Sequence, residues 1–179
     1  MKYERRRRPT RRCTGWQFRC APLPQVSLVV RTDKIMSIKN RVEDARQLWQ
    51  SGRKEGAFLN ALIAVAATAR KRYPHPQYKD KESFLKFLQE SHGGRISAEF
   101  RGECIPIEEI FYKWVRCQLV HEGELPFDIE FINDKNEGMT IRAGGPPEYK
   151  LLIGYNWINY LINAIINASE NKAEFNESV

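Results

Sequence analysis

The stretch from Lys54 to Tyr73 constrains the fold of this 179-residue chain more than any other feature. It carries six alanines, its apolar residues lie almost all round the circumference of a helix, and Pro74 ends it. A helix that is apolar on nearly every side has to be buried among other elements, and small side chains allow neighbouring helices to approach closely. The sequence therefore predicts a central helix within a mainly α-helical bundle.

Four further helices are expected around this one. Each is marked by apolar residues at helical spacing and by a start or stop signal such as Ser37, Pro106 or Gly93-Gly94. The expected ranges are 38–51, 81–92 with Asp80 as its cap, 106–122 and 152–168. The last helix carries a polar stripe, interpreted as a solvated face, that consists of Asn156, Asn159, Asn163 and Asn167.

A small β-hairpin is expected between the fourth and the last helix. Residues 127–133 alternate between apolar and polar side chains, and residues 139–142 follow after a polar turn. Residues 95–105 indicate an irregular connection or a short strand, and residues 170–179 a frayed tail. The expected fold is mainly α, a bundle of about five helices that carries one hairpin.

The positive charge of the chain is concentrated at its beginning. The chain has 29 basic and 22 acidic residues, but residues 1–35 hold ten of the basic and two of the acidic ones. The other 144 residues carry a net charge of −1, so their charge gives no evidence for a nucleic-acid-binding surface. We expect residues 1–35 to be a disordered basic arm, a targeting peptide, or a segment before the native start at Met36. The domain is expected over residues 36–179.

The cysteines indicate neither disulfides nor a metal site. Cys104 and Cys117, the two beyond residue 35, lack close-paired spacing, which favours reduced thiols in a cytoplasmic protein. A zinc site that combines them with His92 and His121 lacks any C-x-x-C or H-x-x-x-H pair. We therefore expect no metal and no cofactor. No stretch is apolar for long enough to span a membrane.

The fourth helix contains the most informative pattern, an R-x-x-x-x-H motif formed by Arg116 and His121. With this motif on a late helix, the sequence resembles the HEPN family, helical domains whose ribonuclease members share an R-x(4–6)-H motif. The resemblance covers most of residues 36–179 in architecture, but only Arg116 and His121 in residue identity. Many active members have a polar residue, often Asn, directly after the arginine, where this chain has Cys117.

The resemblance implies a metal-independent endoribonuclease of toxin or defence type, which cleaves RNA by attack of the 2′-hydroxyl. Arg116 would hold the phosphate and His121 would move the proton, with Tyr112, Cys117 and Glu122 as supporting residues. A homodimer whose motif helices meet about a two-fold axis, and a regulatory partner protein, are also implied. The alternative is a non-catalytic HEPN-like module that dimerises or binds a nucleotide or a partner.

Helix geometry favours a different, structural interpretation of the motif. On a straight α-helix Arg116 and His121 are separated by about 140° and do not share a face. His121 can then end the buried stripe of the helix, while Arg116 pairs with an acid such as Glu109 or Glu122. The positions of these side chains in the tertiary structure test this interpretation.

Overall fold

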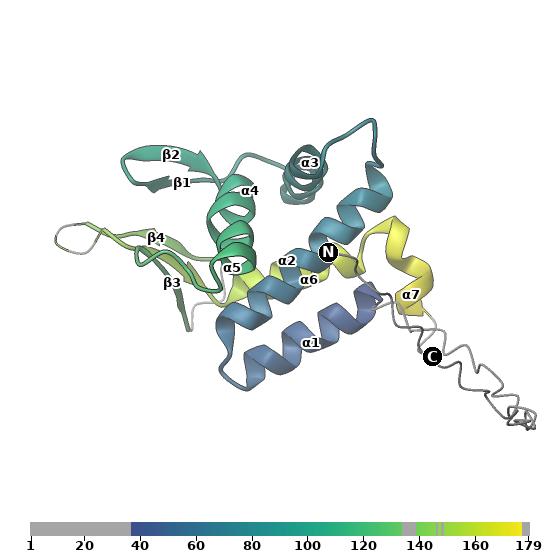
Figure 1. The fold of residues 1–179 in the computed structure, drawn as a ribbon, viewed down its shortest axis with the longest axis horizontal. Coiled ribbons are helices and arrows are strands. Elements are labelled where there is room, and N and C mark those ends of the chain that lie inside the picture. Colours follow the sequence, from purple (N-terminus) through teal and green to yellow (C-terminus); the bar gives the residue numbers. More distant parts are fainter. Residues whose placement is uncertain (1–36, 134–138, 146, 148, 177–179) are drawn as a thin grey trace, which may run out of the picture. The chain divides into compact units, whose positions relative to one another are not determined.

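The computed structural model describes residues 37–133, 139–145, 147 and 149–176, all within one compact unit, residues 34–179. The segment 1–35, for which the sequence predicts an extension, lies outside the described residues. The described part is mainly α-helical, with two small sheets on one side of the helices (Figure 1). None of the helices in these ranges combines the length and the apolar character needed to cross a bilayer.

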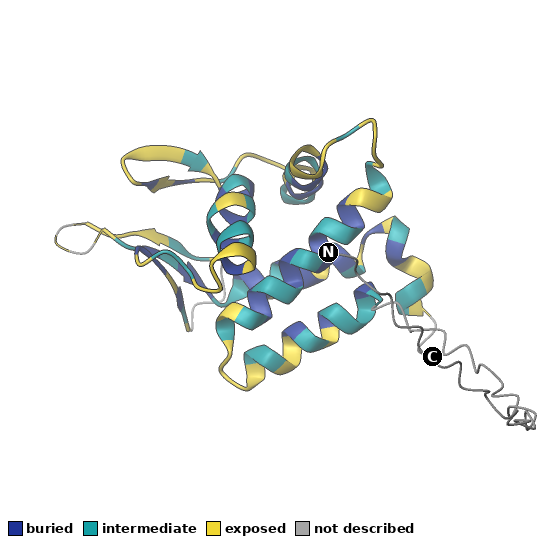
Figure 2. Ribbon diagram, viewed as in Figure 1, coloured by how far each residue is buried: buried dark blue, intermediate teal, exposed yellow. Residues whose placement is uncertain are grey.

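Helices α1 (Ile38–Gln50) and α2 (Lys54–Arg72) lie side by side and are joined by a turn in which Gly52 has a φ of 78°. The predicted start of α1 is confirmed, because Ser37 Oγ accepts a hydrogen bond from Asn40 N at 3.2 Å. Helix α2 is the central helix, because α1, α3 (Asp80–His92) and α6 (Asn156–Ile166) all contact it. Most of its surface is buried or half-buried (Figure 2).

Helix α3 (Asp80–His92) differs from the prediction at its start. Asp80 is the first helical residue and not the cap, because Arg70 binds both oxygens of its carboxylate. The helix start is closed instead by the backbone N–H of Lys79, which donates to Glu82 Oε2 at 2.9 Å. Gly93 ends the helix as predicted, with a φ of 64°.

Residues 95–105 contain more regular structure than an irregular connection or a single short strand. Strands β1 (Ser97–Phe100) and β2 (Glu103–Pro106) form an antiparallel hairpin, and its turn is Arg101-Gly102. Both turn residues have positive φ, 54° and 80°. Strands of four residues carry too few apolar–polar alternations to stand out from a loop in the sequence.

The predicted helix after Pro106 is present, but its winding changes along its length. The two ends, α4 (Ile107–Glu109) and α5 (Gln118–His121), are α-helical, and the segment between them, η1 (Ile110–Cys117), is a π-helix. The π-helix, with its i→i+5 hydrogen bonds, is rare and is found frequently at functional sites. Its inner face packs on the core, where the Phe111 ring lies 5.2 Å from the ring of Trp157.

The prediction that residues 127–133 and 139–142 pair with each other in a hairpin is wrong. Strands β3 (Ile129–Ile132) and β4 (Ile141–Ala143) do not pair with each other, because a third strand, β5 (Leu151–Gly154), lies between them. Strand β5 pairs with β3 in parallel and with β4 in antiparallel orientation, so the hairpin of this region is β4–β5.

The last helix, α6 (Asn156–Ile166), consequently begins later than the predicted Leu152. A short apolar run before a helix fits either a strand or the first helical turn, so periodicity does not separate the two. The predicted asparagine stripe is confirmed as a polar face over most of its length, since Asn159, Asn163 and Asn167 are exposed.

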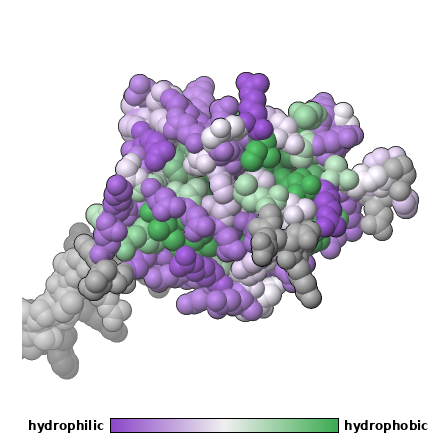
Figure 3. Space-filling view, turned by 180° about the vertical axis from the view of Figure 1, so that it is seen from behind, coloured by the Kyte–Doolittle hydropathy of each residue, from purple (hydrophilic) through white to green (hydrophobic). Residues whose placement is uncertain are grey.

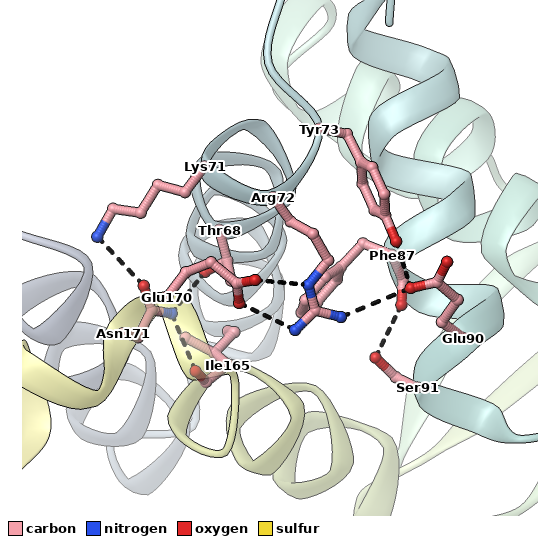
Figure 4. A network of polar contacts seen from close by, with 10 residues as sticks. All are labelled: Thr68, Lys71, Arg72, Tyr73, Phe87, Glu90, Ser91, Ile165, Glu170 and Asn171. Atoms are coloured by element: carbon pink, nitrogen blue, oxygen red, sulfur yellow. Dashed lines mark hydrogen bonds and ion pairs between the residues drawn. The ribbon is translucent and has the colours of Figure 1, made fainter.

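The end of the chain is folded up to Asn176 and is not a frayed tail. A 3₁₀ turn, η2 (Ser169–Asn171), and helix α7 (Lys172–Asn176) follow α6. Asn171 is fully buried, and its Nδ2 donates hydrogen bonds to Thr68 Oγ1 at 2.8 Å and to Ile165 O at 2.9 Å (Figure 4). Thr68 lies 103 residues earlier in the chain, so no local pattern could predict this attachment to α2.

Candidate functional site

Arg116 lies near the end of η1 and is half-buried. Its guanidinium carbon is 5.5 Å from the centre of the Tyr112 ring, and that ring packs edge-on against Phe84 of α3 at 5.2 Å. The Nε of Arg116 is buried and has no hydrogen-bond partner among the described residues. A buried donor without an acceptor costs about 1–3 kcal/mol, so native structures hold few of them.

Two further cations lie on the same side of the molecule, and each has an acid partner. Arg70 binds Asp80 through two hydrogen bonds of 2.5 Å, and Lys81 Nζ lies 2.8 Å from Glu109 Oε1. The hydrogen bond from Arg70 lowers the pKa of Asp80 most, and the charge of Arg116 lowers that pKa further. Arg116 is therefore near Asp80, but within the described ranges it forms no ion pair with any carboxylate.

His121 is exposed at the end of α5, and the next residue, Glu122, is exposed as well. No hydrogen bond or ion pair joins His121 to Arg116 in the part of the chain that the structure describes. Arg116 belongs to the π-helical segment and His121 to the α-helical turn that follows it. Arg116 is half-buried whereas His121 is exposed, so the two motif residues of one chain differ in their surroundings.

The structural interpretation of the motif is wrong in both of its parts. His121 is exposed and does not end the buried stripe of the helix. Glu109 binds Lys81 and not Arg116, and Glu122 forms no ion pair with Arg116 in the described ranges. Within the described residues, His121 is thus exposed, and Arg116 lies over the Tyr112 ring without an acid partner. Between them, Cys117 is a half-buried free thiol.

The basic run at the end of α2 serves the fold. Arg70 binds Asp80, Lys71 Nζ lies 2.5 Å from Glu174 Oε1, and Arg72 donates two hydrogen bonds of 2.9 Å to the carboxylate of Glu170 (Figure 4). The bonds from Arg72 lower the pKa of Glu170 to about 2. Because these cations are engaged with acids of the same chain, they are poor candidates for contacts with RNA.

The remaining histidines show no arrangement for chemistry. His75 is exposed, and His92 stacks on Tyr160 with ring centres 5.0 Å apart. Burial lowers the pKa of His92. No three or more His, Cys, Asp or Glu side chains in the described residues are grouped so that they could hold a metal ion.

An ion pair between a buried carboxylate, Asp128, and an exposed arginine, Arg101, has no counterpart in the sequence analysis. Asp128 is 6% exposed, and Arg101 binds it through Nε at 2.6 Å and Nη2 at 2.9 Å. The Arg101 guanidinium also lies over the rings of Trp114, at 4.3 Å, and Phe100, at 4.9 Å. The alternation of residues 127–133 predicts that Asp128 lies on the solvent-facing side of a strand. The only sequence feature at its partner, Arg101, is the Arg-Gly dipeptide, which indicates a turn.

Comparison with known proteins gives one family. A family model described as Rv1289 matches residues 37–96 and 96–178, which together make up most of the chain. The two matched segments meet at Ile96, just before β1. No curated protein and no solved structure matches the chain.

Proposed function

The chain belongs to the Rv1289 family, and we propose that it is a HEPN-like, metal-independent endoribonuclease of toxin or defence type. The observation that carries the proposal is Arg116, a half-buried arginine whose Nε has no partner and whose charge has no carboxylate partner among the described residues. Such a guanidinium is free to bind an anion from outside, and its planar fork fits a phosphate group. His121, exposed on the same helix, supplies the imidazole that proton transfer needs.

The proposed active site forms between two copies of the chain. One chain holds Arg116 and His121 apart, but two motif helices packed about a two-fold axis would bring an arginine of one copy toward a histidine of the other. An exposed apolar residue of the motif helix supports such packing, since Val120 in α5 is 51% exposed. Further apolar side chains gather in two areas on the face turned away from the view of Figure 1 (Figure 3).

In the proposed reaction, His121 takes the proton of a 2′-hydroxyl, and the oxygen attacks the adjacent phosphorus. Arg116 stabilises the negative charge that develops on the phosphate oxygens. The bond to the 5′-oxygen breaks, and that oxygen takes a proton from the second imidazole of the dimer. The products are a 2′,3′-cyclic phosphate and a 5′-hydroxyl. Tyr112 holds Arg116 in position, and Cys117 and Glu122 border the site.

The test is cleavage of single-stranded RNA by the full chain in the presence of EDTA. Arg116→Ala and His121→Ala should each reduce the cleavage rate on the order of a hundredfold or more. Arg116 is needed to stabilise the charge on the phosphate oxygens, and His121 is needed to transfer the proton. Arg95→Ala and His75→Ala remove exposed side chains of the same types outside the motif and should leave the rate unchanged. Cleavage that depends on a metal ion, or that survives both motif substitutions, would contradict the proposal.

A second candidate, a non-catalytic dimerisation or partner-binding module, is favoured by Cys117. This half-buried thiol occupies the position after Arg116 where many active HEPN members carry a polar residue. If the thiol alone disables the site, Cys117→Asn should gain RNA cleavage over an inert wild type. Wild type and Cys117→Asn that are both inert, but dimeric, would favour the module.

A further inference from the structure

A cleft of about 480 Å³ lies between the turn of the β1–β2 hairpin and the connection from β4 to β5. The hairpin and the three-stranded sheet project to the same side of the helices, and β1 contacts β4 (Figure 1). Two aromatic residues far apart in the sequence line this cleft, Phe127 and Tyr149, and they are 89% and 65% exposed. Two large rings that line one cleft, and are not scattered singly over the surface, give it the aromatic lining that is typical of ligand sites.

The wall of the cleft is held in a defined shape. The Arg101–Asp128 ion pair connects the hairpin turn to the residue after Phe127, and the guanidinium is stacked on Trp114 of η1. Arg101 and Tyr149 are the two described non-glycine residues with positive φ, 54° and 37°, and both line the cleft. Backbone held in this sparsely populated region is found preferentially at binding and active sites.

The charges of the cleft are mostly paired within the chain. Arg101 binds Asp128, and Lys150 Nζ lies 3.3 Å from Glu130 Oε2, which leaves Glu99 as an exposed carboxylate at the rim. Because its basic side chains are paired with acids, this lining does not attract a phosphate group strongly. The two aromatic side chains instead offer stacking surfaces to a flat, uncharged ring.

We propose that the cleft binds an unpaired nucleobase of single-stranded RNA, stacked on Phe127 and Tyr149. The inference rests on the proposed ribonuclease function and assigns its substrate class, an RNA strand with unstacked bases. Phe127 follows His121 by six residues, which span at most about 20 Å of extended chain, so one RNA strand can reach both. Every base has a stacking face, so the recognition tolerates different sequences. A protein partner is disfavoured, because the exposed rings line a small cleft and a stable protein interface needs about 800 Å² per partner.

The experiment measures binding of a fluorescein-labelled single-stranded RNA by fluorescence anisotropy. The protein is the full chain with Arg116→Ala and His121→Ala, so that the RNA stays intact. Added to it, Phe127→Ala and Tyr149→Ala should each weaken binding by about 5- to 100-fold, the effect of losing one stacked base. Phe127→Trp and Tyr149→Phe keep a ring and should bind about as tightly as the parent. Met139→Ala, which removes an apolar side chain that is 44% exposed and does not line the cleft, is the control.

Unchanged RNA affinity in both alanine variants would overturn the inference. A loss of dimer mass in light scattering with Phe127→Ala, with RNA affinity retained, would also overturn it and assign the cleft to a protein interface. The two proposals fail separately. If a chain with an intact motif cuts RNA with equal kcat/KM before and after Phe127→Ala, only the base site is wrong. If RNA binding depends on Phe127 but the wild type never cuts RNA, only the nuclease is wrong.

Discussion

At the scale of single residues, the buried amide of Asn171 connects the end of the chain to the central helix. Its Nδ2 donates to Thr68 and to Ile165, and Thr68 in turn donates to Ala64 O at 2.9 Å. A buried acceptor that loses its donor costs free energy, whereas an exposed one is served by water. The amide is therefore expected to contribute to stability in a way that the exposed asparagines of α6 do not.

Asn171→Ala should accordingly lower the free energy of unfolding by about 1–3 kcal/mol, because two buried acceptors lose a donor. Urea unfolding followed by circular dichroism measures the change. Asn163→Ala, at an exposed position of α6, is the matched control and should change the stability by less than about 0.5 kcal/mol. Equal midpoints for the two variants would show that α7 and η2 are attached by other contacts.

Glu170 makes the free energy of unfolding depend on pH in the acidic range. Its pKa is lowered from 4.5 to about 2 by the hydrogen bonds from Arg72, so the folded state favours the ionised carboxylate. A carboxyl group with a lowered pKa stabilises the fold fully above its unfolded pKa, and this contribution is lost as the pH falls toward the folded value.

Glu170→Gln should therefore be less stable than the wild type at pH 7, and the difference should shrink as the pH falls from about 4.5 to about 2. Thermal melts at closely spaced pH values test this. Glu43→Gln, which replaces an exposed carboxylate on α1, should keep a small and constant difference over the same range. A stability gap for Glu170→Gln that widens on acidification would contradict the assignment.

At the scale of elements, the connection between β4 and β5 brings the backbone of Gly144 close to the backbone of Lys150. A Cβ atom at Gly144 would lie 2.7 Å from Lys150 O and 2.8 Å from Lys150 N, whereas a Cβ at Gly145 would meet no atom within 4 Å. The hydrogen bond from Gly144 N to Lys150 O, at 2.7 Å, closes the same turn. A side chain at position 144 therefore has to push the two strands apart.

Gly144→Ala should destabilise the protein by about 1–3 kcal/mol, the usual cost of a forced backbone shift, while Gly145→Ala should be nearly neutral. Chemical denaturation of the two variants side by side measures this. In hydrogen exchange, the amides of β4 and β5 should lose protection in Gly144→Ala more than those of α1. Identical behaviour of the two variants would mean that the turn has room that the geometry does not suggest.

The motif helix shows how far an element can be predicted. Its position and length follow from Pro106 and the apolar spacing, because these signals act within the element. The π-helical winding of Ile110–Cys117 does not follow, because it depends on how the aromatic side chains fit against α2 and α6. The partner of Glu109 is equally non-local, since it is Lys81 of α3, 28 residues earlier in the chain.

At the scale of the whole molecule, the apolar surface near the motif predicts association. Light scattering at tens of micromolar should give twice the chain mass of 20.9 kDa. Val120→Glu places a charge on this surface and should shift the mass toward the monomer, while Met139→Glu, which is exposed elsewhere, should not. A monomer mass for the wild type would remove the composite active site and with it the proposed mechanism.

The sequence alone determined where the five longer helical segments of this protein lie and much of their burial. Caps such as Ser37, breakers such as Gly93 and the apolar faces of α1 and α2 act between residues within a few positions of each other, and such signals survive in a linear pattern. The tertiary structure alone decided the insertion of β5 between β3 and β4, the attachment of Asn171 to Thr68, and the burial of Asp128 under Arg101. These features depend on partners far away in the chain, and whether a strand pairs or a charge is neutralised is settled only when the packed core brings those partners together.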